Sequence, residues 1–549
     1  MEKQWINYKD FSICIQDDRF DVALDGVSIF ALPVRSSVPA NGKQDVDEDI
    51  LVREIETAGD GVSVRWRTRS SLWSEKTYLL DVTSDSFLYR IQVSGKGAPD
   101  EIQYFSGVPA DRWGAQYEAA GYLVPMSASG IETYTRSIAQ DGELNLHFMV
   151  PPMYCYPFWM EDCDTWFGLG LAAKPGQYNF ERFIYHNHRE RFHLSVPLFG
   201  HTQVDGVWEA PGILGCPGRD GLDVLKNYSA WHYRNQYANP LPHRESDWWY
   251  GPFFCGWGEQ APMCGKYNAS IFDMASQKVY TEMSEHLDAL DLHPTAIIID
   301  DKWQRYYGEA LPDPEKWPDM RAFVEQEHKK GRRVVLWFKS WNCEGLPADE
   351  CITLWSQPVS ADPTNPKYQD RMRKTIHTLL SSDEGCYNCD GFKIDFADCL
   401  PRGKDVKAYE PGVYGVEMLK RLYRLLYDSA KAAKPDALIN CSNCHPYLAE
   451  TTDQVRLHDY DSRQRSVKSV MKFRMDITEA ALPGVSVDTD FPAFGNHRDS
   501  MAYIRYAPSL GVPDLYRLSP IEGSAFTDED WREIRAIWKR YAENRKRQP

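Results

Sequence analysis

The hexapeptide GFKIDF at residues 391–396 holds a lysine and an aspartate in an otherwise apolar segment. Because side chains alternate along a β-strand, Lys393 and Asp395 are expected on one face and Phe392, Ile394 and Phe396 on the other. An ammonium group beside a carboxylate keeps the carboxylate ionised. If the strand ends in a pocket, Asp395 is a nucleophile or one half of a catalytic carboxylate pair. A buried structural ion pair is the alternative explanation.

The composition favours a neutral, sugar-like ligand. The chain has 549 residues, a net charge of −17, and an aromatic share of 13% that includes 18 Trp and 31 Tyr. The charge argues against nucleic acid and anionic membranes as partners, because both attract basic surfaces. Aromatic side chains stack on flat apolar faces, those of sugar rings included. Neutral substrates, carbohydrates among them, therefore fit the composition better, and the sequence is compatible with a homo-oligomer.

Targeting segments and cysteines give a second set of expectations. The N-terminus has no apolar signal-like stretch, and no apolar run is long enough to cross a bilayer, so a cytoplasmic location is predicted. The 13 cysteines form an odd, scattered set typical of reduced thiols. Cys386, Cys389, Cys441 and Cys444 form two CxxC pairs, but each pair sits at a predicted strand edge, where a zinc site is unusual. No metal and no cofactor are expected.

The pattern of predicted elements changes near residue 240. Residues 1–240 contain short alternating segments such as VSVRWRTRS and RFHLSVPLFG, which predict an antiparallel β-sandwich domain. Residues 241–520 contain eight strand candidates that alternate with helices, which predicts a (β/α)₈ barrel. Residues 521–549 predict a helical tail. A doubly wound open sheet is the rival fold, but CGWGEQ is a poor match to the Gly-rich turn that should follow its first strand.

In such a barrel the chemistry lies at the C-terminal ends of the strands. A ring of charged and aromatic residues there predicts a polar ligand. The residues expected at these ends are Trp257 and Glu259; Asp300, Asp301 and Trp303; Trp337, Lys339 and Trp341; Lys393 and Asp395; Cys441 and Ser442; Arg456, His458, Asp459 and Asp461; and Asp488 and Asp490.

Several of these motifs, taken in order, resemble a known clan. IIIDDKWQRYYGEALPDPEKWPDM, RRVVLWFKSW, ADPTNPKYQDRM, GFKIDF and INCS resemble consecutive parts of the barrel in the α-galactosidase/raffinose-synthase clan, glycoside hydrolase families 36 and 27 and more distantly 31. The resemblance covers roughly residues 250–500. It implies an N-terminal β-sandwich before the barrel, and the C-terminal β-domain usual in family 36 is expected to be reduced or missing.

The resemblance implies a retaining α-glycoside hydrolase, exo-acting and α-galactosidase-like. Asp395 would attack the anomeric carbon, and a second carboxylate would act as general acid and base. The segment QVRLHDYDSR offers Asp459 for that role and Asp461 as the alternative. Their shared strand parity does not choose between them.

The resemblance and the chemistry of the side chains also imply substrate-binding roles. Asp300 and Asp301 would accept hydrogen bonds from sugar hydroxyls, Lys393 would donate to a hydroxyl while keeping Asp395 ionised, and aromatic faces would pack against the ring. The full set of expected substrate-binding residues is Asp300, Asp301, Trp303, Trp337, Lys339, Lys393, Cys441, Arg456 and Trp257, with Glu259 as a further candidate.

Departures from the clan pattern leave the sugar open. Lys302 replaces the usual Gly between the Asp pair and the Trp, and NCHPYLAE replaces the Gly-rich run after Cys-Ser. Lys302, Lys339 or Arg456 could serve a carboxylate or sulfate on an acidic sugar. Three other functions stay open: a transglycosidase of the same clan, a metal-dependent barrel hydrolase or lyase using the aspartates as ligands, and a non-catalytic sugar-binding protein.

Overall fold

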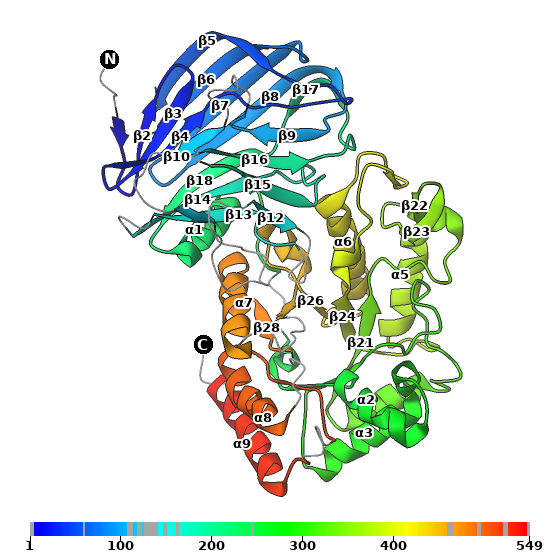
Figure 1. Cartoon of the computed structure of the whole chain (residues 1–549). Helices are drawn as coiled ribbons and strands as arrows, with labels where there is room; N and C mark the ends of the chain where they lie inside the picture. Colours follow the sequence, from blue (N-terminus) through cyan, green and yellow to red (C-terminus); the bar gives the residue numbers. More distant parts are fainter. Residues whose placement is uncertain are drawn as a thin grey trace.

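The computed structural model describes residues 5–58, 61–106, 114–117, 123–125, 141–145, 151–160, 164–189, 191–242, 246–457, 466–490, 496–519 and 525–545. Two antiparallel sheets form one end of the molecule and a parallel barrel forms the other (Figure 1). No helix in the described ranges has both the length and the apolar character needed to cross a membrane.

Within the described residues, the two antiparallel sheets have nine strands each and pack face to face. The first contains, in pairing order, β1 (Trp5–Asn7), β2 (Ser12–Ile15), β3 (Arg19–Leu24), β4 (Val27–Pro33), β10 (Ala115–Tyr117), β16 (Arg191–Pro197), β15 (Arg182–His188) and β12 (Gly142–Asn145), with β9 (Glu101–Tyr104) beside β16. The second contains β11 (Leu123–Pro125), β13 (Cys155–Met160), β14 (Thr165–Ala172), β18 (Gly212–Gly218), β8 (Phe87–Gly97), β7 (Glu75–Val82), β6 (Gly61–Ser70) and β5 (Asp47–Ala58), with β17 (Val204–Glu209) beside β8. Aromatic pairs such as Phe20–Phe87 and Phe30–Phe158, with ring centroids 5.4 Å apart in each, join the sheets. The predicted β-sandwich is confirmed.

The barrel consists of eight parallel strands. Their order is β19 (Phe253–Cys255), β20 (Ala296–Ile299), β21 (Arg333–Lys339), β24 (Gly391–Asp395), β26 (Leu438–Cys441), β27 (Gln454–Arg456) and β28 (Ser486–Asp488), with β29 (Asp514–Leu515) beside β19. Closure between the last two strands comes from the segment before β29, where the Val512 amide donates to the Val487 carbonyl over 2.7 Å. Runs such as AIII and VVLWF are buried, as parallel strands covered on both faces require. The predicted (β/α)₈ barrel is confirmed, and GFKIDF is its fourth strand.

Helices cover the outside of the barrel. They are α2 (Trp257–Tyr267), α3 (Gln277–Ala289), α4 (Met320–Lys329), α5 (Pro366–Leu380), α6 (Gly415–Ala433), α7 (Val467–Ala481), α8 (His497–Tyr506) and the C-terminal α9 (Asp528–Arg545). The preceding helix, α1 (Gly221–Arg234), packs against β14 and β18 of the sandwich and against α7. Short 3-10 turns lie at η2 (Asp247–Tyr250), η3 (Ile271–Met274), η4 (Ala348–Glu350), η5 (Ala397–Cys399), η6 (Pro446–Thr451) and η7 (Ala507–Ser509). A small sheet of β22 (Cys351–Leu354), β23 (Gln357–Ala361) and β25 (Val406–Lys407) lies beside α5 (Figure 1).

The first barrel helix differs from the prediction. The sequence predicts one helix over residues 270–290, directly after the first strand, whereas α2 already begins at Trp257 and residues 271–289 form η3 and α3. α2 contains Pro262, a residue that argues against a helix when the sequence is read alone. Trp257 and Glu259 therefore lie in the first turn of a helix rather than at a strand end.

One glycine fixes the start of the fourth strand. Gly391 has a φ of +150°, and a Cβ there would lie 2.3 Å from the carbonyl oxygen of Leu438 on β26. Only a residue without a side chain permits this approach. The strand that carries Asp395 is thereby held tightly against its neighbour.

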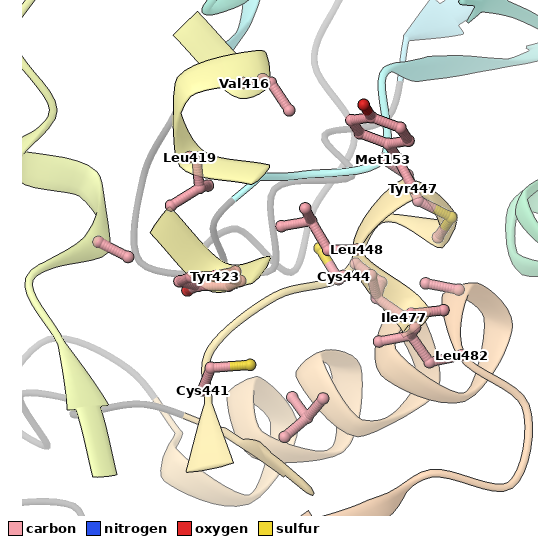
Figure 2. Close-up of a cluster of buried hydrophobic side chains, with 14 of the residues drawn as sticks. Met153, Val416, Leu419, Tyr423, Cys441, Cys444, Tyr447, Leu448, Ile477 and Leu482 are labelled. Atoms are coloured by element: carbon pink, nitrogen blue, oxygen red, sulfur yellow. The ribbon is translucent and has the colours of Figure 1, made fainter. Parts of the chain in front are cut away.

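The sandwich and the barrel share a junction around the start of α6. Gly415 has a φ of +59°, and a Cβ there would meet the Phe180 carbonyl at 2.1 Å. The amides of Val416 and Glu417 donate to the carbonyls of Phe180 and Tyr178, at 2.8 and 2.9 Å. Figure 2 shows the apolar cluster nearby, where Met153 of the sandwich lies close to side chains of α6, η6 and α7.

Candidate active site

Asp395, the last residue of β24, is held on both carboxylate oxygens. Oδ1 accepts from an Arg456 guanidinium nitrogen and from the Phe396 amide, both at 3.0 Å, and Oδ2 accepts from Trp337 Nε1 at 3.0 Å. The Asp395 side chain is 14% exposed, whereas Arg456 is fully buried. A carboxylate with fixed orientation and partial access to solvent is what a nucleophile at a strand end requires.

The structure corrects the expected neighbour of Asp395. Lys393 Nζ ion-pairs with Asp300 at 2.8 Å and donates to the Tyr516 hydroxyl at 3.2 Å. Alternation does place Lys393 and Asp395 on one face, but Lys393 lies one layer deeper and reaches across the barrel interior toward β20 and β29. The cation in contact with Asp395 is Arg456, from the end of β27.

These contacts extend into a chain of paired charges. Arg456 also donates to Asp490 at 2.8 Å, and the Tyr516 hydroxyl donates to the other Asp490 oxygen at 2.6 Å. We name the chain the buried ionic network; its members are Asp300, Lys393, Tyr516, Asp490 and Arg456. All five are at most 3% exposed, and each charge in the network contacts an opposite charge.

The pairing decides the charge state of the network. Burial works against ionisation of Asp490, but Arg456 and Lys393 hold the pKa of its carboxyl well below the ordinary value. Burial likewise opposes the charged form of Lys393, yet Asp300 keeps its pKa well above the ordinary value. For Asp488 beside them, burial and then the Asp490 charge raise the pKa to about 6. Asp490 and Lys393 are therefore both charged at neutral pH.

A second group lies nearer to solvent, above the buried ionic network. Tyr307 donates its hydroxyl to Asp301 at 2.7 Å, and its ring centroid lies 3.9 Å from Lys302 Nζ and 4.2 Å from Lys339 Nζ. Phe396 is 39% exposed, has a left-handed φ of 57°, and lies 4.9 Å from Lys339 Nζ. We name these five residues the rim cluster. Burial raises the pKa of Asp301 to about 6, although the Tyr307 hydrogen bond opposes the shift.

The other sequence-predicted residues lie in more enclosed places. Trp303 is fully buried and donates to the Trp337 carbonyl at 2.8 Å, which makes it core packing. Cys441 is fully buried in the cluster of Figure 2, and burial raises the pKa of its thiol to about 11. Glu259 accepts from the amides of Leu518 and Ser519 and holds that segment in place.

Trp257, His458 and the two acid/base candidates are also predicted site residues. Trp257 is half-buried, with its ring centroid 6.5 Å from that of Phe272. His458, Asp459 and Asp461 lie outside the described residues. The site therefore has a placed nucleophile candidate, whereas its acid/base candidates are known from the sequence alone.

The arrangement of the carboxylate side chains can be compared with what a metal-dependent hydrolase or lyase would need. Within the described ranges, no group of three or more His, Cys, Asp or Glu side chains is arranged to hold a metal ion. Asp300, Asp395 and Asp490 each contact a lysine or arginine instead. A cation beside a carboxylate opposes binding of a second cation.

Tyr307, Phe396 and Tyr516 are site residues that the sequence reading missed. Tyr516 directly follows the eighth strand, so the same search of strand ends, carried to the last strand, would have found it. Alternation predicts Phe396 on the opposite face of the strand, but its left-handed backbone ends the alternation there. Tyr307 lies in a loop and carries no periodic signal.

Comparison with known proteins supports the fold. No protein-family model matches the chain, and no curated protein matches it. Several solved structures do match the chain. An α-N-acetylgalactosaminidase from Bifidobacterium bifidum superposes with a TM-score of 0.65 at 11% identity, over 98% of this chain and 93% of that one. A family 31 sulfoquinovosidase from E. rectale gives 0.60 at 12% identity, over 96% and 82%. An α-galactosidase from Thermus thermophilus gives 0.52 at 14%, over 88% and 99%. The chain has the β-sandwich and barrel fold of these glycoside hydrolases.

Proposed function

We propose that this protein is a retaining α-glycoside hydrolase with Asp395 as its nucleophile. The observation that carries the proposal is the partly exposed Asp395 carboxylate at the end of the fourth barrel strand, held by Arg456 and Trp337. Sharing a fold with glycosidases supports the class of reaction by analogy, whereas the site carries the chemistry.

The reaction follows from this placement. One oxygen of Asp395 attacks the anomeric carbon and forms a glycosyl-enzyme, while a second carboxylic acid protonates the departing oxygen. That second group then takes a proton from water, which attacks the anomeric carbon and releases the sugar with its configuration retained. Hydrogen bonds from Arg456 and Trp337 orient the Asp395 carboxylate.

Asp459 is the proposed acid/base, with Asp461 as the alternative. Both follow Arg456 by a few residues, and Arg456 itself contacts Asp395. In retaining glycosidases the two carboxyl groups lie about 5–5.5 Å apart. A chain that leaves the barrel directly beside the nucleophile is the natural source of the partner carboxyl.

The proposal separates direct sugar ligands from supporting residues. Asp301, Trp337 and Lys339 line the outer side of the site and are proposed to contact the sugar. Asp300, Lys393 and Arg456 have partners within the chain and are proposed to contact it from below. Trp303 and Cys441 are fully buried and are proposed to support the wall of the sugar site. Trp257 is half-buried and is proposed to lie at the edge of that site. The α-galacto configuration is the default for the sugar, which is cleaved from the chain end, and its substituents are left open.

A panel of aryl α-glycosides tests the proposal. Wild-type protein should release the aryl alcohol in a burst when deglycosylation is slow, and NMR should show an α-configured first product. Asp395→Ala should lower turnover by about four orders of magnitude or more. Asp398→Ala, three residues further on, is the matched control and should stay near wild type. Full turnover in Asp395→Ala, or an inverted product, contradicts the mechanism. Added acceptor alcohols distinguish hydrolysis from transfer.

A further inference from the structure

Lys339 differs from the buried lysines of this protein. Lys76 pairs with Asp45, Lys393 with Asp300 and Lys431 with Asp453, all within 2.8 Å, because a buried ammonium without a partner is costly. Lys339 is half-buried, and in the described ranges no carboxylate lies within 4.0 Å of its Nζ. Its close neighbours are the faces of Tyr307 and Phe396.

The sheet register places Lys339 beside the nucleophile. Lys339 on β21 is the direct register partner of Asp395 on β24, so the two side chains point to the same face of the sheet. Asp395 nevertheless takes its hydrogen bonds from Arg456, Trp337 and its own chain. A second cation is therefore not required to balance the charge of Asp395.

The other charges of the rim cluster do not neutralise Lys339 by contact. Lys302 is satisfied by an ion pair with Glu344 at 2.7 Å. Asp301, the acid of the rim cluster, takes its hydrogen bond from the Tyr307 hydroxyl. The two aromatic rings favour the ammonium through cation–π attraction and fix its position, while leaving its N–H donors available.

We propose that Lys339 binds an anionic group on the glycoside, so that the preferred substrate is an acidic sugar rather than a neutral one. This deepens the proposed function and rests on it. A carboxylate and a sulfonate or sulfate share the required chemistry, a compact group of oxygens that accepts a charge-assisted hydrogen bond from an ammonium.

Matched substrates test this inference. We would compare kcat/KM for aryl α-galactoside with the α-galacturonide, and for α-glucoside with the α-glucuronide and the 6-sulfo-α-glucoside. The wild type should favour one anionic member of a pair, and the identity of that member separates carboxylate from sulfonate. Lys339→Met should lower the ratio of anionic to neutral kcat/KM by about 10- to 100-fold, the value of one charged hydrogen bond. Lys339→Arg should restore part of the ratio.

Lys302→Met is the matched control, because its ammonium lies against the same Tyr307 ring but is already paired. Its ratio should change much less than that of Lys339→Met. A wild type that prefers neutral glycosides, or a Lys339→Met ratio equal to that of the wild type, overturns the inference. Circular dichroism of Lys339→Met establishes that a changed ratio does not come from misfolding.

A binding measurement keeps the two proposals apart. Calorimetry of the full-length Asp395→Ala variant with galacturonate, glucuronate and 6-sulfoglucose, against galactose and glucose, reads the anion preference without turnover. Asp395-dependent cleavage of neutral glycosides with no preference for acidic sugars contradicts the inference and leaves the glycosidase proposal standing. If the wild type cleaves no glycoside but binds acidic sugars through Lys339, anion binding by Lys339 stands and the glycosidase proposal is contradicted.

Discussion

The buried ionic network and the rim cluster occupy the same end of the barrel but treat charge in opposite ways. In the network, Lys393 and Arg456 each contact a carboxylate, and the members are at most 3% exposed. In the rim cluster, the close neighbours of Lys339 Nζ among the described residues are the faces of Tyr307 and Phe396, and Phe396 is 39% exposed. Paired, enclosed charges hold a site in shape, whereas an accessible charge without a partner is suited to a ligand. The difference separates the residues that hold the proposed nucleophile in place from Lys339, which is proposed to select the substrate.

Removing Arg456 should break the network most severely. Arg456→Met removes one of the two cations that stabilise the fully buried Asp490 carboxylate, and one of the two hydrogen bonds to Oδ1 of Asp395. We expect a loss of about 3–5 kcal/mol in the free energy of unfolding, measured by urea denaturation. Turnover should fall by about 10²-fold or more, because Asp395, the proposed nucleophile, is held less firmly. Arg421→Met, which breaks an exposed ion pair with Glu410, is the control. Wild-type stability in Arg456→Met would show that the network is not structural.

The rim cluster should respond to pH. Asp301 has a pKa of about 6 in the folded protein against 3.8 ordinarily, so it ionises only as the pH rises through 6. If its carboxylate accepts sugar hydroxyls, kcat/KM should fall below pH 6, and Asp301→Asn should lose that dependence along with about 10-fold in kcat/KM.

The same shift fixes the sign of a stability effect. Because the folded pKa is raised, the unfavourable contribution of ionised Asp301 appears between pH 3.8 and 6 and is complete above pH 6. Asp301→Asn should therefore gain stability relative to wild type between pH 4 and pH 7, by roughly 1–3 kcal/mol. An unchanged difference between the two pH values contradicts the assigned shift.

The smallest effect is expected at the edge of the rim cluster. Lys302 and Glu344 form a partly exposed ion pair. Such pairs contribute about 0.2–1 kcal/mol. Lys302→Met should therefore change the thermal midpoint only slightly, as followed by calorimetry. A large loss of stability would mean that the rim cluster is as structural as the buried ionic network.

The sequence predicts the frame of this site better than its contacts. Strand identity and the common face of Lys393 and Asp395 follow from alternation and from order along the chain. The pairing of Lys393 with Asp300 and of Arg456 with Asp395 does not, because it depends on which layer of the barrel each side chain occupies. The position of Phe396 could not be predicted, because its left-handed backbone places the side chain on a different face from the one that alternation predicts.

The link between Phe180 and the first turn of α6 has a consequence for dissection of the molecule. The first amides of a helix lack partners within the helix, and in α6 two of them are satisfied by carbonyls of the sandwich. α6 is the helix that follows the strand carrying Asp395. A barrel expressed alone would lose these caps and expose the apolar side chains around Met153 and Tyr447 (Figure 2). Gene fragments and chimaeras should therefore keep the two halves together, since residues of the N-terminal half cap a helix of the barrel.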